Sequence, residues 1–70
     1  MTMYKIDGDN NAFRSLRSAK HHVWVAYTQE ERMKYLRDSY ISRIEKDNVV
    51  TMTPIIVTID GYSFGKTIRV

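Results

Sequence analysis

The chain of 70 residues contains no cysteine, so it can form no disulfide and offers no thiolate to zinc or an iron–sulfur cluster. This absence is typical of proteins that work in a reducing compartment. No apolar run approaches the length of a membrane span, and residues 1–7 lack the apolar segment of a signal peptide. We therefore expect a cytoplasmic protein that does not enter the membrane.

Proline and glycine are also scarce, with one proline and three glycines. The sequence shows no repeat, low-complexity segment or linker, so residues 1–70 are predicted to form one small domain. A domain of this size buries only about 60% of the surface that its unfolded chain exposes, and its margin of stability is narrow. If the core is too small, a partner or self-association must cover the remaining apolar surface.

The charge imbalance is small, with 11 Lys and Arg against eight Asp and Glu and a net charge of +3 at pH 7. This excess permits a phosphate-bearing partner but does not argue strongly for one.

The segment Thr51–Asp60 has the densest run of β-branched residues and turn signals on both sides. It is therefore predicted to be the strand with which other segments pair. Tyr40–Glu45 is expected to be the strand before it, and Asp47 and Asn48 are expected to supply the positive φ angles of a tight hairpin turn.

Pro54 interrupts the long strand, and a proline cannot donate to a strand ladder. The strand should therefore bend, bulge or lie at a sheet edge there, and the pattern leaves open which of its faces is buried. Asp60–Gly61 is predicted to form the next turn. The closing strand should begin at residue 62 or 63, end at Val70 and carry a bulge at Gly65.

The N-terminal half begins with a predicted strand, Met3–Asp7, followed by a turn. Ser15 is a candidate N-cap for a helix over Leu16–Tyr27, where apolar residues recur at helical spacing. Thr28 and Glu31 match a capping box that would start a second helix, Gln29–Arg37. One helix broken at Thr28 is the alternative.

The predicted fold class is α+β, with one or two helices packed on a small four-stranded, mostly antiparallel sheet whose last three strands form a meander. The residues predicted to form the core are Tyr4, Ile6, Phe13, Leu16, Ala19, Val23, Ala26, Met33, Leu36, Ile41, Ile44, Ile56, Ile59, Phe64 and Ile68.

Two motifs suggest chemistry but fail on spacing. Gly61–Thr67 ends in Gly-Lys-Thr, yet only three residues separate its glycines and no helix is expected after it, so a nucleotide-binding loop is not predicted. His21 and His22 are adjacent and would point about 100° apart on a helix, without an acid three or four residues away. We therefore expect no metal, no cofactor and no enzymatic activity.

The stronger functional signal is a basic face on the first predicted helix. No acid occurs between Asn10 and Gln29, and long basic side chains share that stretch with a tryptophan. Two aromatic residues near the last turn are candidates for exposure at an interface. The residues predicted to contact a partner are Arg17, Lys20, His21, Trp24, Tyr62 and Phe64.

These features predict a non-catalytic binding module that contacts a macromolecule, most simply another protein. A homodimer that pairs through a free strand edge is one form of this hypothesis. The alternative is a weak nucleic-acid-binding domain, in which the basic helix face meets phosphates and Trp24 stacks on a base.

Overall fold

A computed structural model describes all 70 residues, as six strands and three short helical segments. In chain order these are β1 Thr2–Ile6, β2 Ala12–Phe13, α1 Leu16–Val25, α2 Gln29–Glu31, the π-helix η1 Arg32–Leu36, β3 Tyr40–Glu45, β4 Asn48–Thr58, β5 Gly61–Phe64 and β6 Ile68–Arg69.

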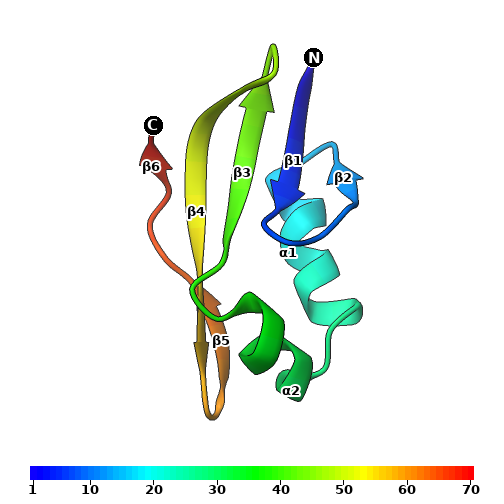
Figure 1. Cartoon of the computed structure of the whole chain (residues 1–70), viewed down its shortest axis with the longest axis vertical. Coiled ribbons are helices and arrows are strands. Elements are labelled where there is room, and N and C mark those ends of the chain that lie inside the picture. The colour runs from blue at the N-terminus through cyan, green and yellow to red at the C-terminus, as the bar shows by residue number, and fades with distance from the viewer.

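The strands form one antiparallel sheet in the order β2-β1-β3-β4-β5, with β6 also paired to β4 (Figure 1). Figure 1 shows the strands running along the length of the molecule, with both chain ends near the same end. The predicted α+β class, with helices packed on a mostly antiparallel sheet, is confirmed. The sheet has six strands rather than four, because β2 was not predicted and the closing strand is divided.

The helical region is divided where the capping signals predicted a division. Ser15 caps α1 by accepting a hydrogen bond from the Ser18 amide, and α1 ends at Val25, two residues before the predicted end. The Thr28 capping box is formed in full and starts α2. The predicted second helix is not one regular α-helix, because α2 passes directly into the π-helix η1.

The hairpin between β3 and β4 turns one residue earlier than predicted. Lys46 and Asp47 have φ angles of 51° and 65°, while Asn48 already pairs with Glu45 in the ladder. Two successive positive φ angles match the twist of the flanking strands in a two-residue hairpin loop. The turn prediction of Asp47 and Asn48 was therefore right for Asp47 and wrong for Asn48.

Pro54 and Gly65 together explain why the closing strand is divided. β5 pairs with residues 55–58 of β4, β6 pairs with residues 51–52, and the register differs by one residue between them. Between these ladders the Gly65 amide donates to the Pro54 carbonyl, and Pro54 has no N–H to return the bond. Gly65 therefore lies opposite the missing donor, in a break between β5 and β6 rather than at a bulge within one closing strand.

The core between the helices and the sheet is small. Its six buried hydrophobic residues are Ile6, Ala19, Val23, Leu36, Ile41 and Ile55. Several predicted core residues, namely Tyr4, Phe13, Leu16 and Phe64, are half-buried and pack against this cluster, whereas Met33 and Ile44 are half-buried outside it.

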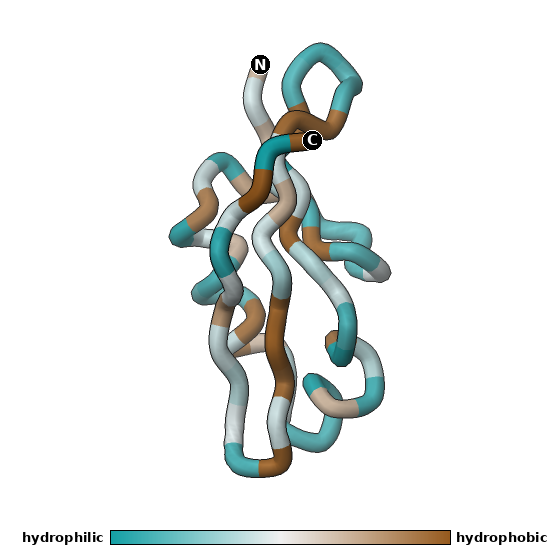
Figure 2. The backbone as a smooth tube through the Cα atoms, turned by 90° about the vertical axis from the view of Figure 1, so that its left-hand side faces the viewer, coloured by the Kyte–Doolittle hydropathy of each residue, from teal (hydrophilic) through white to brown (hydrophobic).

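Four core predictions were wrong, because Ala26, Ile56, Ile59 and Ile68 are exposed. Ala26 lies at the C-cap of α1, and Ile59 lies in the turn after β4. In β4 the residue that faces the helices is Ile55, so Ile56 points to the opposite side of the sheet. Figure 2 shows this apolar stretch of β4 as a brown segment.

Candidate binding site

The fold places β5 beside the exposed side of α1. Lys20 and Trp24 stand one turn apart on α1, and Tyr62 and Phe64 share one face of β5. The rings of Trp24 and Tyr62 stack with centroids 6.4 Å apart, and the Lys20 ammonium lies 5.1 Å from the Phe64 ring centroid. The rings of Tyr62 and Phe64 meet edge to face at 5.6 Å. The structure thus brings together four of the six predicted partner-binding residues.

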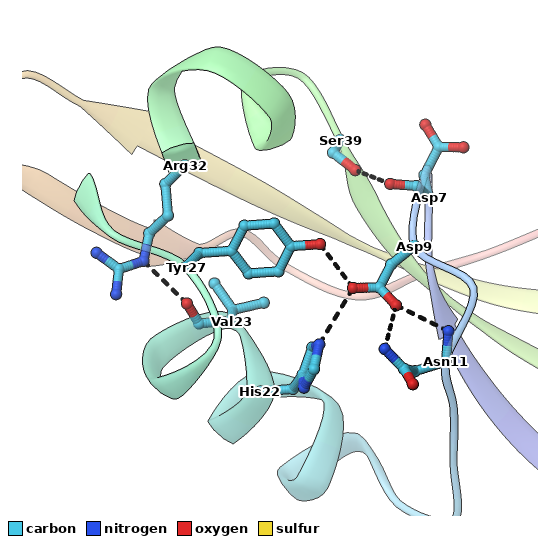
Figure 3. Close-up of polar contacts among 8 residues, drawn as sticks. All are labelled: Asp7, Asp9, Asn11, His22, Val23, Tyr27, Arg32 and Ser39. Carbon is cyan, nitrogen blue, oxygen red and sulfur yellow. Dashed lines mark hydrogen bonds and ion pairs between the residues drawn. The ribbon is translucent and has the colours of Figure 1, made fainter. Parts of the chain in front are cut away.

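Arg32 of η1 contacts both stacked rings and completes this arrangement. Its Nε donates to the Val23 carbonyl at 2.9 Å and its second terminal nitrogen donates to the Trp24 carbonyl at 2.8 Å (Figure 3 shows the Val23 bond). The guanidinium also lies 4.5 Å from the Tyr62 ring centroid and 5.3 Å from that of Trp24. Arg32 therefore caps the last carbonyls of α1 and supports both rings at once.

Arg32 is only 5% exposed and forms no ion pair with a carboxylate. Two carbonyls at a helix C-terminus and two aromatic faces together stabilise its buried charge. Sequence reasoning missed this residue. The available signal was that Arg32 lies four residues before the buried Leu36, on the same side of a helical turn.

We call Lys20, Trp24, Arg32, Tyr62 and Phe64 the aromatic patch. Trp24 is 60% exposed, whereas Tyr62 and Phe64 are half-buried and pack against the core. The exposed ring of Trp24 is therefore held by Tyr62, which itself packs against the core.

The other two predicted residues, Arg17 and His21, lie beside the aromatic patch and not in it. They are exposed and line a shallow hollow of about 440 Å³ on the next face of α1, together with Phe13, Ser18, His22 and Val25. The helical spacing predicted one continuous stripe, but β5 reaches only the side that carries Lys20 and Trp24.

A second polar cluster joins the loop after β1 to the end of α1 (Figure 3). The Asp9 carboxylate accepts a 2.6 Å hydrogen bond from the Tyr27 hydroxyl and lies 3.1 Å from Nε2 of His22. It also accepts bonds from the backbone amide and the side-chain amide of Asn11, both at 2.8 Å. The Asp9 side chain is only 7% exposed, so these donors replace its water.

These contacts shift the pKa of the Asp9 carboxyl and that of the Tyr27 hydroxyl. Burial acts to raise the pKa of Asp9, but the hydrogen bonds from Tyr27, Asn11 and His22 outweigh it and lower the pKa from its usual value of 3.8. Burial, reinforced by the hydrogen bond to the Asp9 carboxylate, raises the pKa of Tyr27 from 10.0 to about 12. Each group is held in the protonation state that the other requires at neutral pH.

The Asp9 cluster corrects one interpretation of the histidines. No acid lies three or four residues from His22, so helical spacing predicted no partner for it, yet Asp9 reaches it from 13 residues earlier in the chain. Neither Asp9 nor Tyr27 carried a sequence signal. Four hydrogen-bond donors surround the Asp9 carboxylate, so the cluster connects the loop after β1 to the C-terminal end of α1.

The Gly-Lys-Thr motif takes the non-helical geometry that was predicted for it. The Gly61–Thr67 stretch forms β5 and the loop before β6, with no helix after it. No group of three or more His, Cys, Asp or Glu side chains is placed to hold a metal ion.

Comparison with known proteins gives no relative: no family model, curated protein or solved structure matches the chain. None of its helices has the length and apolar character required to cross a bilayer.

Proposed function

We propose that this protein is a non-catalytic binding module that contacts another protein through the aromatic patch. The observation that carries the proposal is the position of Trp24, exposed yet stacked on Tyr62 and Arg32. Trp, Tyr and Arg are the residue types that contribute most at protein interfaces. A ring that is already immobilised loses little further conformational entropy when a partner covers it.

A protein partner is favoured over nucleic acid by the state of the cations in the patch. Arg32 is buried and committed to the carbonyls of Val23 and Trp24, and the Lys20 ammonium lies over the Phe64 ring. Few basic groups on this face are therefore free to neutralise phosphates, and phosphate contacts supply most of the affinity for nucleic acid.

Nucleic-acid binding is the second candidate, supported by the acid-free stretch between Asn10 and Gln29 and by the exposed face of Trp24. A base could stack on this ring while Arg17, one face further round α1, meets a phosphate.

The proposal also includes a cytoplasmic location and the absence of a cofactor. A cysteine-free chain suits a reducing compartment. Asp9 and Tyr27 bond to each other, so neither is free to act as a base or a nucleophile.

Capture from the native host with tagged variants tests the proposal. A specific partner should be retained by the wild type and lost with Trp24→Ala, with affinity for the purified partner reduced about tenfold or more. Tyr35→Ala is the matched control, because Tyr35 is 59% exposed, nearly the same as Trp24, but lies on η1 outside the patch. A partner that both variants bind as well as the wild type does would overturn the assignment of the patch.

Trp24 is the only tryptophan, so its fluorescence tests the second candidate directly. Single-stranded and duplex oligonucleotides at low salt should quench it if a base stacks there, and Arg17→Ala combined with Lys20→Ala should abolish binding and its salt dependence. Unchanged fluorescence and no mobility shift at low salt would remove the nucleic-acid candidate.

A further inference from the structure

The helices cover only one face of the sheet, which leaves the other face open. Ile41, Thr53 and Ile55 point toward the helices and are at most 2% exposed. Successive residues of a strand point to opposite faces, so their neighbours in β3 and β4 point away from the helices. Tyr40 and Pro54 are partners in the ladder and therefore share this second face.

This second face is mostly apolar, with Lys5, Ser42 and Ser63 as its polar residues. The register pairs Met3 with Ile44 and Met52 with Ile68, which places both pairs on it as well. We call it the open face and define it by Met3, Tyr40, Ile44, Met52, Pro54, Ile56 and Ile68.

The open face also contains a hollow. Tyr40, Met52, Pro54, Ile56 and Ile68 of this face line a hollow of about 360 Å³, and the rest of its lining comes from Arg37, Asp38, Ser39, Ile55 and Val57. Ile56 and Ile68 are 47% and 54% exposed. Protruding isoleucines beside a hollow of this kind allow one copy of the face to fit against another.

The total exposed area exceeds that of a compact monomer of the same mass. A compact monomer of 8.3 kDa should expose about 4,600 Å², whereas this chain exposes 5181 Å². The elongated shape, 36 × 20 × 18 Å, accounts for part of the difference. The excess of about 600 Å² is surface that the fold leaves uncovered.

The charges on the open face favour a second copy of the same chain as its occupant. Lys5 at the β1 side is the only charged residue on the strands of this face, and Ser42 lies between it and Met52. An interface between identical copies places the same residues on both sides, so like charges at its centre would repel. The strands at the centre of the open face meet this requirement, and the two charged residues that line the hollow, Arg37 and Asp38, are of opposite sign.

We propose that two copies of the chain associate through their open faces, with the sheets packed face to face. This contact leaves the aromatic patch on the outside of the dimer, so it goes beyond the proposed function and does not depend on it. The homodimer predicted from the sequence would pair through a free strand edge, whereas this dimer forms through the faces of the two sheets.

Light scattering after gel filtration tests the proposal, with the full chain loaded from about 5 to about 500 µM so that mass action reveals a weak dimer. The wild-type mass should rise from monomer to dimer across this range. Ile56→Asp and Ile68→Asp should each raise the dissociation constant about tenfold or more, because each buries a charge in an apolar contact. Ile59→Asp is the matched control: Ile59 is 81% exposed in the turn beyond the open face and should not matter.

A monomeric mass for the wild type at every concentration would overturn the proposal. A dimer that Trp24→Ala dissociates and Ile56→Asp does not would overturn it too, and would place the contact at the aromatic patch instead. Circular dichroism confirms that each variant is folded.

A second measurement does not depend on the stability of the aspartate variants. The chain has no cysteine, so single-cysteine variants report position directly. Ile68→Cys should cross-link into a dimer with a short bismaleimide, and Ser18→Cys on the exposed side of α1 should not. The reverse pattern in a dimeric protein would contradict the proposal.

Discussion

Tyr27 and Asp9, 18 residues apart in the chain, are joined by a hydrogen bond of 2.6 Å. This bond ties the segment after α1 to the loop after β1, while on the other side Arg32 holds the Val23 and Trp24 carbonyls. The C-terminal end of α1 is thus fixed by two unrelated polar contacts. Trp24 lies between them, so both contacts determine how the aromatic patch is presented.

Tyr27→Phe keeps the ring and removes the donor to Asp9. We expect it to lower the free energy of unfolding by about 1–2 kcal/mol at neutral pH, the usual effect of losing a hydrogen bond to a charged group that is partly shielded. Because folding raises the Tyr27 pKa from 10.0 to about 12, this stabilisation is complete below pH 10 and is lost as the pH rises through about 12.

Urea unfolding at neutral pH and in the alkaline range measures this difference between Tyr27→Phe and the wild type. The difference should shrink above pH 10, the ordinary value for tyrosine. Tyr35→Phe, at an exposed tyrosine, should match the wild type throughout. Equal stability of Tyr27→Phe and wild type at neutral pH would show that the bond contributes nothing.

Stability at acidic pH should depend on Asp9. Its contribution is lost as the pH falls, whereas that of Tyr27 is lost as the pH rises. Folding lowers its pKa below 3.8, so the ionised carboxylate stabilises the fold above that pH, and this contribution is lost as the pH falls through the folded value. Glu31 titrates in the same direction, because hydrogen bonds from the backbone and side chain of Thr28 lower its pKa. We expect Asp9→Asn to be less stable than the wild type at neutral pH and to lose less stability on acidification.

Thermal unfolding from pH 7 down to below pH 4 measures this slope, with Glu31→Gln as the comparison for the second group and Asp60→Asn as a control at an exposed turn. A wild-type slope that persists unchanged in Asp9→Asn would assign acid sensitivity to other carboxyl groups.

Arg32→Lys preserves the charge but replaces a planar fork with a single ammonium, which cannot reach two carbonyls and two ring faces together. We expect a loss of about 1–3 kcal/mol in the free energy of unfolding, because a carbonyl at the end of α1 is left unpaired in a buried site. The emission of Trp24 should also change, since its ring loses the guanidinium. Arg37→Lys, at an exposed arginine, is the matched control, and a variant indistinguishable from it would argue against the capping role of Arg32.

Local signals predicted most of the fold correctly. Ser15 and the Thr28 capping box fix helix starts within a few residues, and alternation with β-branched residues marks the β3 and β4 segments. Such signals act over a few neighbouring residues, so a single chain reveals them. Lys46 shows their limit, because the exact residues of a tight turn depend on the register of both strands.

The missed features depend on contacts between distant segments. Asp9 reaches Tyr27 and His22 from the loop after β1, and Arg32 reaches the end of α1 from η1. The sequence left the inward face of β4 open because Pro54 obscures the alternation, and the structure places Ile55 in the core instead of the predicted Ile56. In the candidate site, helical spacing correctly grouped Lys20 with Trp24, but only the path of β5 separates them from Arg17 and His21.

Gly65 gives the sharpest test of the divided closing strand. A Cβ added there would lie 3.3 Å from Pro54 Cβ and Cγ and 3.3 Å from Ile56 Cδ1, closer than ordinary contacts allow, and the proline ring cannot rotate away. We expect Gly65→Ala to lower the free energy of unfolding by about 1–2 kcal/mol through this overpacking. Gly61→Ala is the control, because a Cβ at Gly61 meets nothing within 4 Å. Denaturant unfolding of the two variants side by side gives the comparison, and equal midpoints would show that the Pro54 and Gly65 segments are not held this close in solution.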